Sequence, residues 1–315
     1  MRNGQVNEGP LVSVIIPAYN RAGIIGETIE NIFKQTYPNI EVIVVDDGST
    51  DHTQEILRSF DSRIRWAVQE NAGPAAARNR GIGMARGEII AFQDSDDSWN
   101  PAKIERQVSL LEKAGDSVVC CICNAVVQHP DVTYISFENA PIHPPIEEGI
   151  WLNPAEVLAT RFILFNQAAV VRRDVLRKIG GFDESFRLME DMELALRLSL
   201  EGPWAFIRVP LATRQSKLAR TLSSEATPQI VAENEVRIRE GVLRIMGQTS
   251  RFADLRPLME QELSRARRQL RAVQIRGSKG LGAPALGWGL EQIERLRMAA
   301  YRRTPWFPKM KVARA

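Results

Sequence analysis

The sequence lacks a long apolar run, and its few cysteines lie together. No stretch of about 18 apolar residues occurs in the chain, which argues against a membrane-spanning helix. Residues 1–10 are polar and lack the apolar core of a secretory signal, so we expect a flexible N-terminus and a cytoplasmic protein. The three cysteines are Cys120, Cys121 and Cys123, and their single C-x-x-C has no second ligand pair. This favours buried, reduced thiols over a zinc site.

A glycine-rich phosphate loop is also missing. In dinucleotide-binding proteins the pattern G-x-G-x-x-G follows the first strand. Here residues 17–23, which follow the first apolar run, read Pro-Ala-Tyr-Asn-Arg-Ala-Gly. The sequence therefore argues against nicotinamide binding, and against a nucleotidyltransferase that would need such a loop.

The excess of basic residues is confined to the end of the sequence. The net charge is +3, but residues 261–315 hold 13 Lys and Arg against 3 Asp and Glu, so the rest is mildly acidic. This contrast indicates two parts with different roles. We expect residues 11–222 to form the main domain and residues 223–315 a basic helical extension. The extension could pack on the domain, form a homodimer or dock on an anionic membrane surface. No nucleic-acid-binding module is recognised.

Apolar runs alternate with helical patterns over the first 125 residues. The runs are apolar throughout, which is typical of a mostly parallel sheet covered by helices on both faces. Ligands of such sheets bind at the carboxyl ends of the strands, where polar residues follow three of the runs. The proline-rich residues 126–150 are expected to be an irregular loop over that site. Strands are expected at residues 11–16 (ended by Pro17), 41–45, 64–68, 88–92 and 166–172.

Three carboxylates in four residues follow the expected strand at 88–92. Asp94, Asp96 and Asp97 would repel one another unless a hard cation such as Mg²⁺ or Mn²⁺ lay between them. Mg²⁺ usually joins one or two carboxylates to substrate phosphates, so the cluster indicates a metal-bound diphosphate. The alternative is a solvated acidic turn.

Residues after the first two strands suggest nucleotide binding. Asp46 and Asp47 could accept hydrogen bonds from a nucleobase or ribose, or could cap the next helix in a tight turn. Tyr19 could stack on a base, or could be a half-buried packing residue.

Charged residues farther along the chain suggest phosphate binding and proton transfer. Arg78 or Arg80 could reach a diphosphate, because guanidinium forks match phosphate oxygens, or could be surface charges. Glu190 and Asp191 begin an expected helix, where the helix dipole favours acidic residues in any case. The functional alternative is a general base that takes a proton from an acceptor hydroxyl.

Taken together, these motifs resemble the family 2 glycosyltransferases of the GT-A fold. Each motif alone is modest evidence, but their order and spacing are specific, and they cover about residues 10–215. The motifs read VIIPAYNR at 14–21, QTYPNIEVIVVDDGSTD at 35–51, NAGPAAARNRG at 71–81, IAFQDSDD at 90–97, GGFDE at 180–184 and ED at 190–191.

The resemblance implies a mixed, mostly parallel GT-A sheet and a metal-dependent, inverting sugar transfer. The expected donor is a nucleotide-diphosphate sugar, most simply a UDP-sugar, and the acceptor a carbohydrate or a lipid-linked one. The implied setting is surface polysaccharide or glycolipid assembly at the cytosolic side of a membrane. The resemblance implies Asp191 as the catalytic base and Asp97 as a ligand of Mn²⁺ or Mg²⁺. The implied contacts of the nucleotide sugar are Pro17, Tyr19 (stacked on the base), Asp47 (bound to the base), Arg78 (bound to the nucleotide or diphosphate) and Asp96 (bound to the ribose). Possible supporting residues are Asn20, Asp46, Asp94, Glu190 and Arg214.

Two features of the family are missing. Many relatives carry a His after the last strand that helps to hold the metal or diphosphate, but residues 211–216 read Leu-Ala-Thr-Arg-Gln-Ser. A third protein ligand to the metal is therefore in doubt. The Gln-x-x-Arg-Trp signature of processive synthases is also missing, which favours transfer of a single sugar.

The alternative function is a non-catalytic nucleotide-sugar-binding or scaffold protein that retains the fold.

Overall fold

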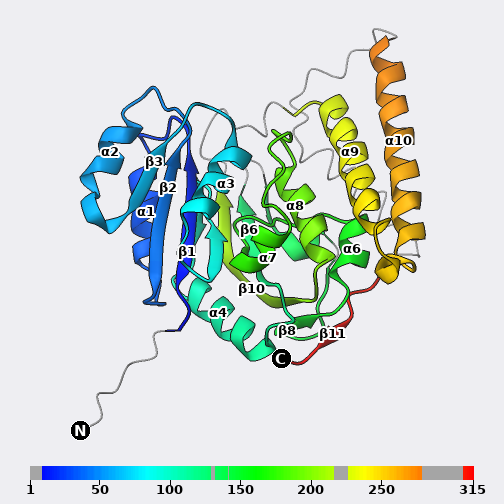
Figure 1. The fold of residues 1–315 in the computed structure, drawn as a ribbon, viewed down its shortest axis with the longest axis horizontal. Coiled ribbons are helices and arrows are strands. Elements are labelled where there is room, and N and C mark those ends of the chain that lie inside the picture. Colours follow the sequence, from blue (N-terminus) through cyan, green and yellow to red (C-terminus); the bar gives the residue numbers. More distant parts are fainter. Residues whose placement is uncertain (1–8, 129–131, 141, 216–225, 279–307) are drawn as a thin grey trace.

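A central mixed sheet organises the protein, with helices on both faces (Figure 1). The computed structural model describes residues 9–128, 132–140, 142–215, 226–278 and 308–315. Within these residues the strand order is β11-β8-β10-β6-β9-β4-β1-β2-β3, with β5 beside β10 and β7 beside β6. The expected fold class is confirmed.

The N-terminal half of the sheet is parallel, as the apolar runs predicted. Its four strands are β1 (Val12–Ala18), β2 (Ile40–Asp46), β3 (Arg65–Val68) and β4 (Ile89–Phe92). The connections contain α1 (Ile25–Phe33), α2 (Thr53–Ser59), a short 3₁₀ turn (Asp61–Arg63) and α3 (Pro74–Met84).

The expectation that Pro17 ends the first strand is wrong. β1 continues to Ala18, and Pro17 pairs with Val45 of β2. Pairing of β1 with β4 reaches only to Ile15. Proline has no N–H to donate, and here it lies beyond the end of that second ladder, where such a residue is tolerated.

The second half of the sheet is mixed. β9 (Ala169–Arg172) runs antiparallel to both β4 and β6 (Cys120–Gln128), and so joins the two halves. β10 (Trp204–Gln215) is parallel to β6 and antiparallel to β5 (Ser98–Trp99). The helices of this half are α4 (Lys103–Ala114), α6 (Pro154–Thr160), α7 (Arg173–Lys178) and α8 (Glu190–Ser199).

The expectation of an irregular loop at residues 126–150 is also wrong. The segment contains the end of β6, β7 (Thr133–Ile135), α5 (Ser136–Asn139) and most of β8 (Glu148–Trp151). Pro144 and Pro145 lie between α5 and β8, outside the paired residues. β7 pairs with the nearby end of β6, whereas β8 is held by β10, which lies far away in sequence and which local pattern does not reveal.

Both faces of the sheet are buried, which explains why its strands are apolar throughout. In β1, the side chain of Ile15 belongs to one core cluster, whereas those of Val14 and Ile16 belong to the other. Successive residues of a strand point to opposite faces, so each cluster fills one side of the sheet. Cys120, Cys121 and Cys123 in β6 are buried free thiols, as expected, and burial raises their pKa values.

The predicted C-terminal helical extension packs on this domain. α9 (Pro228–Met246) is followed by a 3₁₀ turn (Ser250–Phe252) and α10 (Arg256–Ser278), and the two helices lie side by side (Figure 1). Ile238, Val242 and Met259 belong to the same core cluster as Ile15. β11 (Val312–Ala313) then returns to the sheet and pairs with β8. None of the described helices is both long and apolar enough to cross a membrane.

One buried lysine lacks a hydrogen-bond partner among the residues that the structure describes. Lys103, at the start of α4, is fully buried, and its Nζ lies 3.9 Å from the centre of the Trp99 ring. Within the described residues Nζ makes no hydrogen bond. Burial lowers the pKa of Lys103 to about 8, because the charged form is costly to desolvate. The contact with the ring offsets only part of this cost.

Lys103→Met is expected to raise the free energy of unfolding at pH 7 by about 1–3 kcal/mol. Folding lowers the pKa of Lys103. The wild type therefore carries the full cost of burying a charged ammonium below about pH 8, and this cost disappears as the pH rises toward the usual lysine pKa of 10.5. The difference in free energy of unfolding between the variant and the wild type, measured with urea, should therefore become smaller over that pH range. Lys113→Met, at an exposed position of the same helix, serves as the control. A less stable Lys103→Met protein at pH 7 would contradict this account.

Candidate active site

The loops after β1 and β2 are joined by side-chain hydrogen bonds at the carboxyl edge of the sheet. Asn20 Oδ1 accepts from Thr50 N at 2.8 Å, and Asn20 N donates to Ser49 Oγ at 2.8 Å. Asn20 adopts a left-handed φ of +52°, which is uncommon outside glycine and marks a constrained loop. The neighbouring Tyr19 is left 43% exposed. This exposure is compatible with stacking on a base, which stays a prediction.

The two aspartates at the end of β2, Asp46 and Asp47, are buried and hydrogen-bonded. Asp47 is 4% exposed and accepts hydrogen bonds from Gln69 Nε2, Ala72 N and Gly73 N at 2.8–2.9 Å. A carboxylate has about four acceptor positions, so about one remains for a ligand. Asp46 accepts from the Ser49 backbone and hydroxyl, and its Oδ2 has no hydrogen-bond partner within the described residues.

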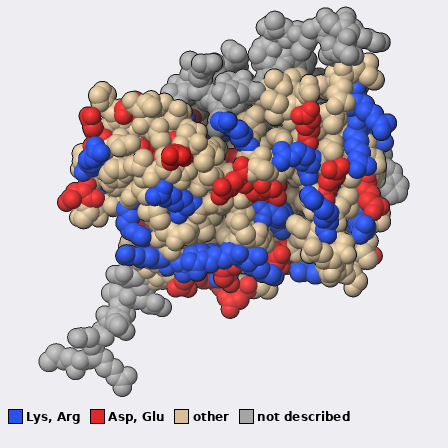
Figure 2. Space-filling model, turned by 45° about the horizontal axis from the view of Figure 1, so that its top comes forward, with Lys and Arg blue, Asp and Glu red and all other residues tan. Residues whose placement is uncertain are grey.

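The acidic cluster after β4 is crowded and short of positive charge. Asp97 is 6% exposed, and its Oδ1 accepts from Gln215 N at 3.0 Å. Burial and the charges of Asp94 and Asp96 raise the pKa of Asp97 well above its usual range. Burial and Asp94 likewise raise the pKa of Asp96, and the nearby cations Arg21 and Arg214 offset this only in part. In the space-filling view, acidic side chains gather near the middle of the visible face (Figure 2).

Such a cluster fits a divalent cation that is shared with the substrate. Within the described residues, no group of three His, Cys, Asp or Glu side chains is arranged to hold a metal ion alone. Hard cations accept one or two carboxylates when phosphate oxygens and water complete their coordination. Burial and the neighbouring aspartates raise the pKa values of Asp96 and Asp97, and a bound cation would offset this cost. Gln215 contributes its backbone N–H, which orients Asp97.

Arg78 connects the acidic cluster to the start of α8. Its guanidinium is 3% exposed, donates from Nη2 to Asp94 Oδ1 at 2.6 Å and donates from Nη1 to Glu190 Oε1 at 2.8 Å. It also lies 5.4 Å from the centre of the Phe182 ring. The predicted diphosphate contact would therefore have to share a guanidinium that already binds two carboxylates. Arg80, the other candidate, is exposed and donates to Val68 O.

The helix α8 begins with Glu190 and the predicted catalytic base, Asp191. Burial, followed by the charge of Glu190, raises the pKa of Asp191 to about 7, while Arg78 opposes this shift. Asp191 Oδ1 accepts a hydrogen bond from Met192 N at 2.8 Å. The preceding residue, Met189, has a left-handed φ of +66°. A non-glycine residue held in this region is a local strain that surrounding contacts must support.

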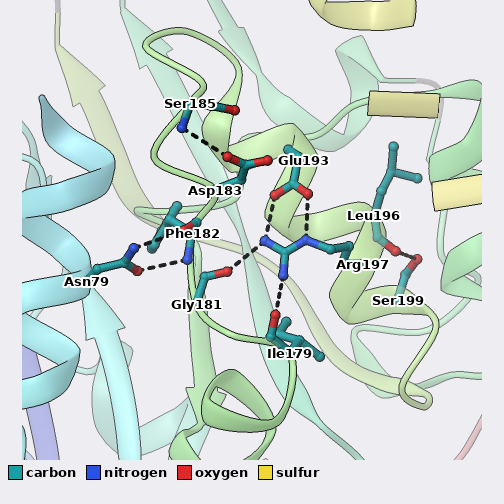
Figure 3. A network of polar contacts seen from close by, with 10 residues as sticks. All are labelled: Asn79, Ile179, Gly181, Phe182, Asp183, Ser185, Glu193, Leu196, Arg197 and Ser199. Carbon is teal, nitrogen blue, oxygen red and sulfur yellow. Dashed lines mark hydrogen bonds and ion pairs between the residues drawn. The ribbon is translucent and has the colours of Figure 1, made fainter. Parts of the chain in front are cut away.

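A polar network supports the turn before α8 (Figure 3). Arg197 makes a two-pronged ion pair with Glu193 and donates to the carbonyl oxygens of Ile179 and Gly181 at 2.6 Å. Asn79 of α3 exchanges two hydrogen bonds with the backbone of Phe182. Gly181 has φ +68°, and a Cβ there would lie 2.5 Å from Asn79 Oδ1, so glycine is required. This network ties α8 to α3, the helix that carries Arg78.

The sequence analysis missed one residue of the cluster. Gln167, just before β9, donates from Nε2 to Asp94 Oδ2. No local motif singles it out. β4 and β9 pair antiparallel, with Ala91 opposite Val170, so the residues just before β9 lie beside those just after β4. Such long-range register cannot be read from one sequence.

Comparison with known proteins then identifies the family. The sequence model described as Glycosyl transferase family 2 matches residues 13–180, slightly more than half of the chain. The chain belongs to glycosyl transferase family 2. The family assignment and the expected resemblance agree.

Relatives of this family 2 member include an uncharacterized glycosyltransferase of Rickettsia typhi and TuaG of Bacillus subtilis, a putative teichuronic acid biosynthesis glycosyltransferase. The first is 34% identical over 187 residues, which cover 59% of this chain and 57% of the relative. TuaG is 43% identical over 109 residues, which cover 33% of this chain and 43% of the relative. The chain thus spans little more than half the length of the Rickettsia typhi relative.

Solved structures support the fold. The structure of Staphylococcus aureus TarS residues 1–349 with UDP-GlcNAc has a TM-score of 0.65 at 18% identity, covering 91% of this chain and 79% of that one. The mannosyltransferase PcManGT of Pyrobaculum calidifontis, in complex with GDP-Man and Mn²⁺, has a TM-score of 0.58 at 23% identity, covering 93% and 86%. At this level of identity the likeness concerns the fold.

Arg78→Met is expected to lower the free energy of unfolding by about 3–5 kcal/mol, because it leaves Asp94 and Glu190 without their buried cation. Arg80→Met, on the same helix but exposed, should change stability far less. Urea unfolding of the two variants without any ligand separates this role from substrate binding. Equal stability losses in the two variants would show that the ion pairs do not hold the site together.

Proposed function

We propose that this protein is a metal-dependent, inverting glycosyltransferase. It would move a sugar from a nucleotide-diphosphate sugar to an acceptor hydroxyl. The observation that carries the proposal is that Arg78 binds Asp94 and Glu190 together, and so brings the helix start with Asp191 beside the acidic cluster. A metal-binding cluster and a carboxylate with a pKa near 7 in one site provide a leaving-group site and a base.

The donor nucleotide is proposed to bind along the carboxyl ends of β1 and β2. The exposed ring of Tyr19 would stack on the base, and the remaining acceptor position of Asp47 would bind a base N–H. Asp96 would bind the ribose. Pro17 lies within β1, directly before this loop, and Asn20 supports the loop.

Asp97 is proposed to hold Mn²⁺ or Mg²⁺ against the diphosphate, while Asp94 binds Arg78. When bound, the cation would neutralise charge on the departing diphosphate. Arg21 and Arg214 add positive charge near Asp96, because both lower the pKa of that carboxyl group.

Asp191 is proposed to act as the general base. Its carboxylate would take the proton of the acceptor hydroxyl as that oxygen forms a bond to the anomeric carbon. The bond from the anomeric carbon to the diphosphate oxygen breaks on the opposite face, and its electron pair leaves with the diphosphate. Attack from the opposite face inverts the configuration. A pKa near 7 means that Asp191 becomes an effective base as pH rises through neutrality.

A UDP-sugar donor and a role in polysaccharide or glycolipid assembly extend this proposal. The structural neighbour TarS was crystallised with UDP-GlcNAc, and the relative TuaG is named for teichuronic acid biosynthesis. These two proteins support a sugar nucleotide as donor and a role in polysaccharide assembly.

Asp97→Ala and Asp191→Asn are each expected to abolish sugar transfer, for different reasons. Asp97→Ala removes the metal ligand and should weaken nucleotide binding that depends on Mn²⁺. Asp191→Asn removes only the base and should leave that binding unchanged. Calorimetric titration of UDP with and without Mn²⁺, beside transfer assays with UDP-sugars, measures both effects.

Asp61→Asn, at a surface turn after α2, is the matched control and should retain full transfer. Full activity in EDTA would refute the metal dependence. Sugar-nucleotide binding without any transfer or hydrolysis in the wild type would favour the non-catalytic alternative.

We further propose that the basic C-terminal part docks on the cytosolic face of an anionic membrane. Exposed Arg268 and Arg271 lie on α10, and blue side chains line the right-hand edge of Figure 2, where α10 lies in Figure 1. The other basic and aromatic residues on which this proposal rests, from Trp288 to Phe307, lie outside the described residues.

The double variant Arg302→Gln/Arg303→Gln is expected to reduce binding to phosphatidylserine vesicles by on the order of tenfold or more, since each basic residue contributes about 1 kcal/mol. The matched double variant Lys34→Gln/Lys113→Gln removes the same charge from exposed sites on the main domain and should bind like the wild type. Vesicle sedimentation at low and high salt measures the effect. Equal binding of both variants would rule out docking through this segment.

A further inference from the structure

The helix α9 of the C-terminal extension contacts the turn that leads to the predicted catalytic base. Asn234, which is 7% exposed, donates from Nδ2 to Leu188 O at 3.1 Å. Its Oδ1 accepts from Arg237 Nη1 at 3.3 Å. A carboxamide donates from its nitrogen and accepts at its oxygen, so these two partners fix its orientation. The Asn234 side chain therefore joins α9 to the turn before α8, residues 182–189.

A second residue of α9 holds the same turn. Arg237, three positions after Asn234, donates from Nη2 to Ser185 Oγ at 2.8 Å. Its guanidinium lies 4.2 Å from the centre of the buried Phe186 ring. Residues three positions apart lie on one face of a helix, so α9 presents a single face to the turn. The polar network of Figure 3 joins the same turn to α3 and α8, so three helices hold it.

The hydrogen bond to Leu188 lies next to a strained residue. Met189 has a left-handed φ of +66° and directly precedes Glu190, the first residue of α8. A residue other than glycine stays in this region only where its surroundings hold it there. Leu188 O and Met189 N belong to one planar peptide unit. The bond from Asn234 to this oxygen therefore also restrains φ of Met189, and with it the direction in which α8 begins.

The first residues of α8 are those that the proposed reaction needs. Glu190 binds Arg78, which also binds Asp94, and Asp191 is the proposed base. A base must lie within hydrogen-bond distance of the proton that it removes. A displacement of about 1 Å can lower a rate by on the order of a hundredfold. The matched family model covers residues 13–180, so these contacts of α9 lie beyond it.

We propose that Asn234 is a positioning residue for Asp191: it binds Leu188 O, holds Met189 in its left-handed conformation and so sets the start of α8. Arg237 supports the same turn through Ser185 and Phe186. This inference rests on the proposed glycosyltransferase function. It makes α9 a part of the C-terminal extension on which the rate of transfer depends.

The test separates the rate of transfer from the binding of the donor. Asn234→Asp keeps the size of the side chain and the acceptor for Arg237, but its carboxylate cannot donate to Leu188 O. Asn234→Leu removes both hydrogen bonds at similar volume. Release of the nucleoside diphosphate would be measured in Mn²⁺, with the donor that the wild type uses best among UDP-glucose, UDP-galactose, UDP-N-acetylglucosamine and GDP-mannose. Both variants should lower kcat by about ten- to hundredfold.

Donor binding should not change, because the proposed nucleotide contacts lie on other elements. The KM for the donor, and the calorimetric Kd for its nucleoside diphosphate in Mn²⁺, should stay within about twofold of the wild type. Retained diphosphate binding also shows that the variants are folded. Gln229→Leu, which removes an exposed amide from the same helix, is the matched control and should keep the wild-type kcat.

Two results would overturn the assigned role. The first is a wild-type kcat in Asn234→Asp, which would show that the bond to Leu188 does not position the base. The second is a loss of diphosphate binding as large as the loss of kcat, which would show that Asn234 supports the domain as a whole. A wild type that transfers no sugar from any of the four donors would refute the proposed function, and this inference with it.

Discussion

The site depends on one buried guanidinium. Arg78 is placed by α3, which packs against the parallel half of the sheet, and it reaches Asp94 after β4 and Glu190 at the start of α8. These three segments are separated by up to 112 positions in sequence. Without the cation, the carboxylates of the cluster would face one another in a buried setting with little to offset their repulsion. The arginine therefore makes it possible to concentrate acidic groups where a metal-bound diphosphate would need them.

The two halves of the sheet contribute different parts of the site. The parallel half supplies the loops after β1, β2 and β4, which converge because parallel strands end at one edge. The mixed half supplies Gln215 at the end of β10 and Gln167 before β9. β9 runs antiparallel between β4 and β6, so its start lies at the same edge as the end of β4. The reversed strand β9 thus brings Gln167 to the edge of the sheet that carries the site. In a purely parallel sheet, the residue before this strand would lie at the opposite edge.

The parts of this structure that sequence could predict are those set by local pattern. Continuous apolar runs indicated buried parallel strands, and the polar residues after them indicated the edge that carries Asp47 and Asp97. Pairings between distant segments were not predictable, which is why β8 and the role of Gln167 beside Asp94 were missed. The ion pairs of Arg78 were missed for the same reason. Sequence offered it as a candidate contact for phosphate, and the fold surrounds it with carboxylates.

The return of β11 to the sheet has a consequence for the order of folding. Lys311 N donates to Asn153 Oδ1 across 158 positions, and β11 covers the outer edge of β8. Contacts between residues so far apart form late, because the loop between them must first be closed. During synthesis, β8 would therefore emerge and pair with β10 long before its outer edge is covered. Over that interval an unpaired strand edge is open to association with other chains, and β11 closes it.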